Sequence, residues 1–214
     1  MKPKTKFQGK GLIKFLNVFF KLAFFLGAFS TGLSVIVKFF DLIRNTGATP
    51  VLLPVFFSPA NNSSLLNLGG DGQTNLKIMW ALGAVSAKAL PTGYDFTFFL
   101  ATVLASCCFL ISIRLIISIL DTVESGNFLI VKNAIRLRWI ALFGITTIFV
   151  QKIKMVISNI YLSDQMDLID LKTTSNFFSF SILSEAVFGY LFLLVLAEVF
   201  RVGAMLKEES ELTI

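Results

Sequence analysis

The chain has 214 residues, of which 55% are hydrophobic and only 15% are charged. Soluble globular domains carry about 25% charged residues, so this composition excludes an ordinary soluble protein and predicts an integral membrane protein. The formal net charge is +6, and five of the lysines fall within the first 14 residues. A basic terminus before an apolar run is typical of a segment that faces anionic lipid, so we expect no direct binding to nucleic acid.

Four apolar stretches follow along the chain, each about 20 residues long and able to cross roughly 30 Å of hydrocarbon as a helix. We predict an all-α integral membrane protein, a four-transmembrane-helix bundle that forms a single membrane domain over residues 1–214. A cleaved signal peptide is the alternative for the first stretch, but its apolar run is long and lacks a small-x-small cleavage motif. The predicted spans are residues 16–39, 96–120, 139–160 and 177–200.

The first two spans are joined by a loop of residues 44–95, which is too short for a domain with a large core of its own. Pro50, Pro54 and Pro59, together with a stretch rich in glycine and asparagine, break it into short segments. We predict a small extracytoplasmic cap, built from strands or from a short helix on the membrane surface.

Lysine and arginine are concentrated in the N-terminal segment and in the loop between the second and third spans. Such an excess marks the cytoplasmic side of a membrane. We therefore predict a multi-pass protein of the cell's inner (cytoplasmic) membrane with both termini in the cytoplasm. Residues 201–214 are then a cytoplasmic tail.

Ionisable residues inside the spans are costly at membrane depth and usually face a partner or water. From a rise of about 1.5 Å per residue, Lys152 and Glu185 lie at a similar depth in the outer half, and Arg114 and Glu198 in the inner half. We predict an ion pair in each half, with lysines near the helix ends, such as Lys38, extending to the headgroups. In one interpretation the pairs fix helix register. In the other they line a ligand or proton pathway, as in a small transporter or channel subunit.

The chain contains no histidine, which removes the commonest general base and the commonest transition-metal ligand. The glycine-rich residues 69–72 lack the Lys-Ser/Thr of a phosphate-binding loop. Acidic residues every third position at 164, 167 and 170 could offer oxygen ligands to Ca²⁺ or Mg²⁺, although a solvated acidic face is the simpler explanation. The adjacent Cys107 and Cys108 cannot easily form a disulfide. We expect no enzymatic activity, no cofactor and no bound metal.

Two segments on the predicted cytoplasmic side carry a recognisable pattern, the loop before the third span and the tail after the fourth. The loop holds Gly126-Asn127-Phe128 followed by Asn133, and the tail reads E-x-F-R-x-G-x-x-L-K-E-E-S-E-L-T-I from Glu198 to Ile214. These motifs, together with the four spans, resemble the bacterial family known as domain of unknown function 2975. Ser210 stands where that family often has asparagine.

The resemblance implies a partner rather than a reaction, because the family is frequently encoded beside a Cro/repressor-like helix-turn-helix regulator. We therefore predict a membrane regulator or sensor that binds such a transcription factor through its second loop and its tail. Apolar residues would continue the fourth helix beyond the membrane, and glutamates would attract a basic partner. The alternative is that the tail only anchors the helix and frays, and association with further copies of the chain stays open. The predicted partner-binding residues are Phe128, Asn133, Arg138, Glu198, Phe200, Arg201, Gly203, Leu206, Glu208, Glu209 and Leu212.

Overall fold

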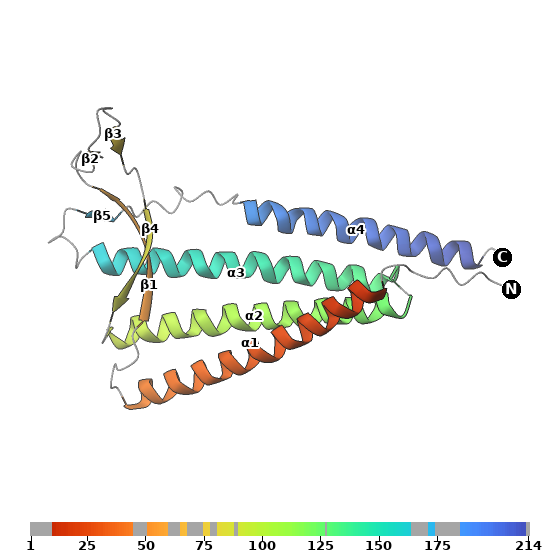
Figure 1. The fold of residues 1–214 in the computed structure, drawn as a ribbon, viewed down its shortest axis with the longest axis horizontal. Coiled ribbons are helices and arrows are strands. Elements are labelled where there is room, and N and C mark those ends of the chain that lie inside the picture. The colour runs from red at the N-terminus through yellow and green to blue at the C-terminus, as the bar shows by residue number, and fades with distance from the viewer. Residues whose placement is uncertain are drawn as a thin grey trace. The chain divides into compact units, whose positions relative to one another are not determined.

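The structure is a computed structural model and describes residues 10–44, 51–59, 65–67, 75–77, 81–87, 90–126, 128–163, 171–173 and 185–212. Long helices dominate this part of the chain, as predicted, and short strands occupy the connections between them (Figure 1). The helices are α1 (Lys10–Arg44), α2 (Thr92–Glu124), α3 (Val131–Ser163) and α4 (Glu185–Leu212). The strands are β1 (Val51–Pro59), β2 (Leu65–Asn67), β3 (Asn75–Lys77), β4 (Ala81–Ala87) and β5 (Leu171–Thr173).

Each of the four helices contains a section that is long and apolar enough to cross a membrane, with mean hydropathy between 1.7 and 2.5. The shortest such section has 25 residues, which makes about 38 Å of helix and exceeds the roughly 30 Å of hydrocarbon. These lengths and compositions indicate a multi-pass membrane protein. Helices α1, α2 and α3 run past both ends of the predicted spans. Residues 177–184, the predicted start of the fourth span, lie outside the described residues.

The chain divides into two compact units. We refer to Met1–Val37, Thr102–Ile148 and Leu183–Ile214 as the helical unit, and to Lys38–Ala101 and Phe149–Ile182 as the strand unit. Helices α1, α2 and α3 contribute residues to both units, whereas α4 belongs to the helical unit alone.

Small side chains allow α3 and α4 to pack closely in the helical unit. The ring of Tyr190 in α4 fills the space beside Gly144 in α3, where an added Cβ would lie 2.2 Å from the ring. Small residues let helices approach each other in lipid, where the hydrophobic effect gives little drive for association. The buried small residues of these two helices, each 1% exposed or less, include Ala134, Ala141, Ala197 and Ala204.

Helix α1 presents large apolar side chains to its surroundings in this unit. Phe15, Phe25 and Phe29 are between 66% and 69% exposed. In water such a face would be an extended apolar patch, whereas in a bilayer it meets acyl chains. On its other side α1 approaches α2 at Gly27, where an added Cβ would lie 3.3 Å from Leu110. Neighbouring helices thus follow chain order in the helical unit, with α3 between α2 and α4 (Figure 1).

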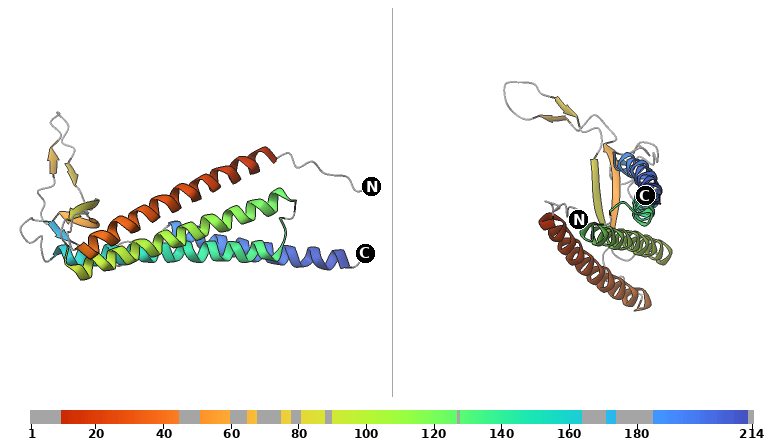
Figure 2. Two further views of the ribbon diagram at one scale, coloured as in Figure 1. Left: turned by 90° about the horizontal axis from the view of Figure 1, so that it is seen from below. Right: turned by 90° about the vertical axis from the view of Figure 1, so that its right-hand side faces the viewer.

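In the strand unit, β1 pairs antiparallel with both β4 and β5, and β2 and β3 form a separate antiparallel pair. Strands β1 and β4 lie side by side, with Val51 opposite Ala87 at one end and Phe57 opposite Ala81 at the other (Figure 2). Pro54 lies opposite Ala84 of β4, and β5 pairs only with residues 57–59, so β1 has a neighbouring strand on one side only at this proline, as at the edge of a sheet. Of the two forms predicted for the first loop, its described residues adopt the strands.

A small apolar core joins this sheet to the helices of the strand unit. Leu53 of β1, Phe98 of α2 and Leu162 of α3 form one cluster and are 0%, 4% and 6% exposed. The rings of Tyr94 and Tyr161 have centroids 5.0 Å apart and link α2 to α3 beside it. The sheet is therefore held by side-chain packing as well as by its connections to the helices.

Candidate functional site

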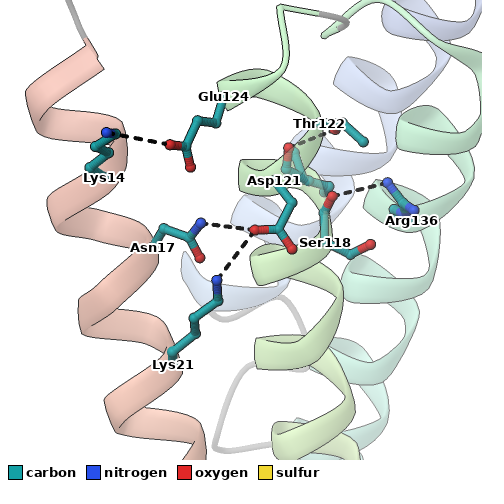
Figure 3. A network of polar contacts seen from close by, with 9 residues as sticks. Lys14, Asn17, Lys21, Ser118, Asp121, Thr122, Glu124 and Arg136 are labelled. Atoms are coloured by element: carbon teal, nitrogen blue, oxygen red, sulfur yellow. Dashed lines mark hydrogen bonds and ion pairs between the residues drawn. The ribbon is translucent and has the colours of Figure 1, made fainter.

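Polar contacts between the helices of the helical unit gather around the turn that joins α2 to α3. Figure 3 shows α1, α2 and α3 connected in sequence by these contacts, and α4 is connected to α3 in the same way. Residues near the end of α2 and the start of α3 lie together because the two helices meet at this turn. We call this set the polar belt; its members are Lys14, Asn17, Lys21, Ser118, Asp121, Thr122, Glu124, Asn133, Arg136, Arg138, Glu198 and Arg201.

Helices α1 and α2 are joined at the belt through the carboxylate of Asp121. It accepts a hydrogen bond from Asn17 Nδ2 at 2.8 Å, and Lys21 Nζ lies 3.5 Å from the same oxygen (Figure 3). Lys14 Nζ lies 4.0 Å from Glu124. Exposed ion pairs contribute about 0–1 kcal/mol each. Asn17 is only 5% exposed, so its hydrogen bond to Asp121 fixes the position of α1 against α2 more than the two exposed lysine contacts do.

The turn between α2 and α3 is built around Asn133. Gly126 ends the preceding helix with φ of +85°, a conformation that glycine adopts without strain. Asn133 Nδ2 donates to Thr122 Oγ1 at 2.8 Å and to the carbonyl of Phe128 at 3.0 Å, and its Oδ1 accepts from Arg136 at 2.7 Å. Asn133 is 1% exposed. Gly126 and Asn133 of the loop motif thus shape the turn. Asn133 is not accessible to a partner.

Helix α4 joins the belt through Glu198. One carboxylate oxygen contacts Arg138 of α3, and the other accepts from Arg201 Nε at 2.8 Å. The predicted pairing of Glu198 with Arg114 is therefore wrong. The prediction matched the two residues by depth, but the helix beside α4 at this level is α3, whereas Arg114 is in α2.

The assignment of this ion pair can be tested by charge exchange. We expect Glu198→Lys to lower the yield of folded, monodisperse protein, because it places a third cation beside Arg138 and Arg201. Adding Arg138→Glu should restore much of the yield, measured by fluorescence-detected size-exclusion chromatography. Adding Arg114→Glu instead is the matched control and should give no recovery. Equal recovery from the two second changes would reject the assignment.

Beyond the belt, α4 continues as one helix to Leu212. The predicted continuation of the fourth helix into the tail is thus confirmed. An added Cβ at Gly203 would lie 3.6 Å from Leu129, so the tail helix lies against the turn between α2 and α3. Ala204 beside it is 1% exposed. Six exposed residues of the tail and the turn form what we call the tail–turn surface: Phe128, Met205, Leu206, Glu208, Glu209 and Leu212.

The predicted partner-binding residues thus fall into three groups. Those that belong to the tail–turn surface are accessible. Phe200, Arg201 and Gly203 are half-buried where α4 passes the belt, and Arg138 and Glu198 contact each other. Asn133 alone among them is fully enclosed. Asn17 and Asp121 were not among the predicted site residues, although Asn17 and Lys21 are one turn apart at the start of an apolar run.

A second polar cluster lies in the strand unit. Lys38 Nζ is 2.9 Å from Asp95 Oδ1 and 3.4 Å from Asp41 Oδ2, and the three side chains are 16%, 13% and 5% exposed. Lys38 therefore does not extend to the headgroups as predicted, because two carboxylates bind it within the protein. The i, i+3 spacing of Lys38 and Asp41 is the signal in the sequence that could have revealed this contact.

Several predictions concern residues that the structure does not describe. The side chain of Glu185 is among them, so its pairing with Lys152 stays a prediction, and so do the roles weighed for residues 69–72, 164, 167 and 170. Within the described residues, no group of three or more His, Cys, Asp or Glu side chains could hold a metal ion. Cys107 and Cys108 are both free thiols.

Comparison with known protein families covers the part of the chain that contains most of the belt. The family model described as "Protein of unknown function (DUF2975)" matches residues 73–214. The match includes all of α2, α3 and α4, the turn and the tail, and excludes α1. No curated protein and no solved structure matches the chain.

Proposed function

The chain belongs to the DUF2975 family, and from its tail–turn surface we propose that it is a membrane regulator that binds a cytoplasmic helix-turn-helix transcription factor. The observation that carries the proposal is the helical tail. Helix α4 extends past the polar belt with Leu206 and Leu212 at 60% and 87% exposure. Large apolar side chains displayed among charged residues at the end of a helix are typical of a docking surface.

The charge of the tail supports a basic partner. Glu208 and Glu209 are exposed beside Leu206, so the tail offers apolar anchors within an acidic surface. Complementary charge raises association rates and selects among partners. DNA-binding proteins carry basic surfaces, and the helix-turn-helix class is the one implied by the family resemblance.

The belt supports the proposal by fixing the tail in place. Glu198 holds α4 to Arg138, and the contact between Gly203 and Leu129 holds the tail to the turn. A rigid helix loses less conformational entropy on binding than a frayed one. The same contacts disfavour a transporter or channel subunit, because Glu198 is paired with arginines and is not left to face a pathway.

The proposal includes an orientation. With the lysine-rich N-terminus and the basic turn on the cytoplasmic side of the inner membrane, both termini and the tail–turn surface face the cytoplasm. The loop of residues 44–95 is then extracytoplasmic and would sense the signal. In this proposal the protein is a regulator and not an enzyme.

The partner is tested by affinity capture of the full-length protein from membranes of the native host, with bound proteins identified by mass spectrometry. We expect a helix-turn-helix protein with the intact chain and more than about a tenfold loss with Leu206→Ala, as for removal of a central apolar anchor. Val195→Ala is the matched control, because Val195 lies in the same helix, is 62% exposed and precedes the belt. It should leave capture unchanged.

Truncation after Arg201 keeps the contacts of Glu198 and should also abolish capture. Recovery of the same regulator by the truncated and the full-length proteins would overturn the proposal. Recovery of no soluble partner by either would do so as well.

A further inference from the structure

Arg114 is a charged residue of α2 that belongs neither to the polar belt nor to the cluster around Lys38. It is exposed, and it lies in an apolar section of helix suited to crossing a membrane. Within the described part of the chain it forms no ion pair or hydrogen bond, because Glu198, its predicted partner, is bound to Arg138 and Arg201. A cation in such a position must find water or an anion outside the protein.

The position of Arg114 relative to the belt follows from helix geometry. It precedes Asp121 by seven residues, which is close to two turns, so both residues lie on the same face of α2, about 10 Å apart along the axis. That face meets α1, since Asp121 contacts Lys21. The side chains of Lys21 and Asp121 are 54% and 53% exposed. Arg114 therefore lies on the open seam between α1 and α2, deeper than the belt.

The charge of this seam favours an anion. Its cations are Arg114, Lys14 and Lys21, and its carboxylates are Asp121 and Glu124, which leaves a net charge of +1 (three minus two). The long arginine side chain can extend along an apolar surface and bring its head to the level of the headgroups. Its planar guanidinium binds phosphate through two parallel hydrogen bonds.

The surroundings of the seam suit a lipid better than a free ion. Next to Lys21, on the face of α1 that is turned away from α2, the apolar side chains of Val18, Leu22 and Phe25 are 67%, 57% and 69% exposed. Acyl chains can lie against these side chains while the headgroup meets the cations. We propose that the seam between α1 and α2 binds the headgroup phosphate of an anionic phospholipid, with Arg114 as the main ligand and Lys21 as the second. This site is independent of the proposed transcription-factor partner.

Native mass spectrometry of the full-length protein tests the site. The protein is released from nanodiscs that contain equal amounts of phosphatidylglycerol and phosphatidylcholine, and the retained lipids are identified. The wild type should retain phosphatidylglycerol preferentially, and Arg114→Gln should retain about fivefold less, the effect of one basic residue near a headgroup. Lys132→Gln is the matched control, because Lys132 is also exposed but lies at the start of α3. Its lipid retention should equal that of the wild type.

If Arg114→Gln does not fold, a second measurement with Arg114→Lys tests the same site. Phosphatidylglycerol should raise the thermal unfolding temperature of the wild type more than that of Arg114→Lys, which keeps the charge but loses the planar fork. Equal retention and equal thermal shifts in wild type and variants would overturn the proposal. Displacement of the lipid effect by inorganic phosphate alone would identify a free-anion site instead. If the Arg114 variants change the oligomeric state in phosphatidylglycerol and in phosphatidylcholine alike, the partner of Arg114 is a carboxylate of a second copy of the chain. That result would also reject the lipid proposal.

Discussion

Replacing Lys38 with methionine is expected to destabilise the protein by about 3–5 kcal/mol, the usual cost of removing one partner from a buried ion pair. The reason is that Asp41 and Asp95 are 5% and 13% exposed and would both lose the cation that binds them. Methionine keeps the length and apolar stem of the lysine, so packing changes little. Thermal unfolding in detergent, followed by the loss of monodisperse protein, measures the effect.

Two further variants make this result specific. Lys132→Met removes a lysine that is exposed at the start of α3, and it should unfold like the wild type. Combining Lys38→Met with Asp41→Asn and Asp95→Asn removes all three charges and should recover most of the lost stability, because no charge is left buried. If Lys38→Met behaves like Lys132→Met, the buried cluster does not stabilise the strand unit.

Gly144→Ala is expected to have the second large effect. An added Cβ would lie 2.2 Å from the ring of Tyr190, which is closer than any tolerated contact, so α4 or the ring must move. Overpacking of this kind typically costs about 1–3 kcal/mol. Combining the change with Tyr190→Ala should return part of the loss by opening space for the methyl group, and urea or thermal unfolding measures each variant.

Gly189→Ala is the matched control in the facing helix. Nothing lies within 4 Å of a Cβ added at this position, so the change should be neutral or slightly stabilising through helix propensity. If Gly144→Ala and Gly189→Ala unfold alike, α3 and α4 are not packed through the contact between Gly144 and Tyr190.

The spans could be predicted from the sequence because length and apolarity alone decide whether a helix fits a bilayer. The helical tail could be predicted as well, since apolar residues continue past Arg201 with helical spacing. The partner of Glu198 could not, because the rise per residue gives depth along one helix but does not say which helix is its neighbour. Depth matched Glu198 with Arg114 equally well, and only the packing of α3 against α4 selects Arg138.

The contacts of Asn133 and Lys38 could not be predicted from the sequence either, because both depend on how the chain packs. Asn133 stands three residues into a helix that follows a loop, a place where polar side chains are usually exposed. The turn at Gly126 directs it inward, toward Phe128 and Thr122. Lys38 lies at the end of an apolar run, where extension to the headgroups is the common outcome. Its contact with Asp95 depends on a pairing of α1 with α2 that no local pattern encodes.

Binding of a cytoplasmic regulator to the tail–turn surface is tested most directly by site-specific photocrosslinking in the native host. A photoreactive residue at position 206 or 128 should give an adduct with a helix-turn-helix protein, because Leu206 and Phe128 are exposed on that surface. The same residue at position 195, which precedes the polar belt in α4, should give none. The proposed role of the tail would be contradicted if the regulator formed adducts at position 195 but not at 206 or 128. It would also be contradicted if no position gave an adduct with the regulator.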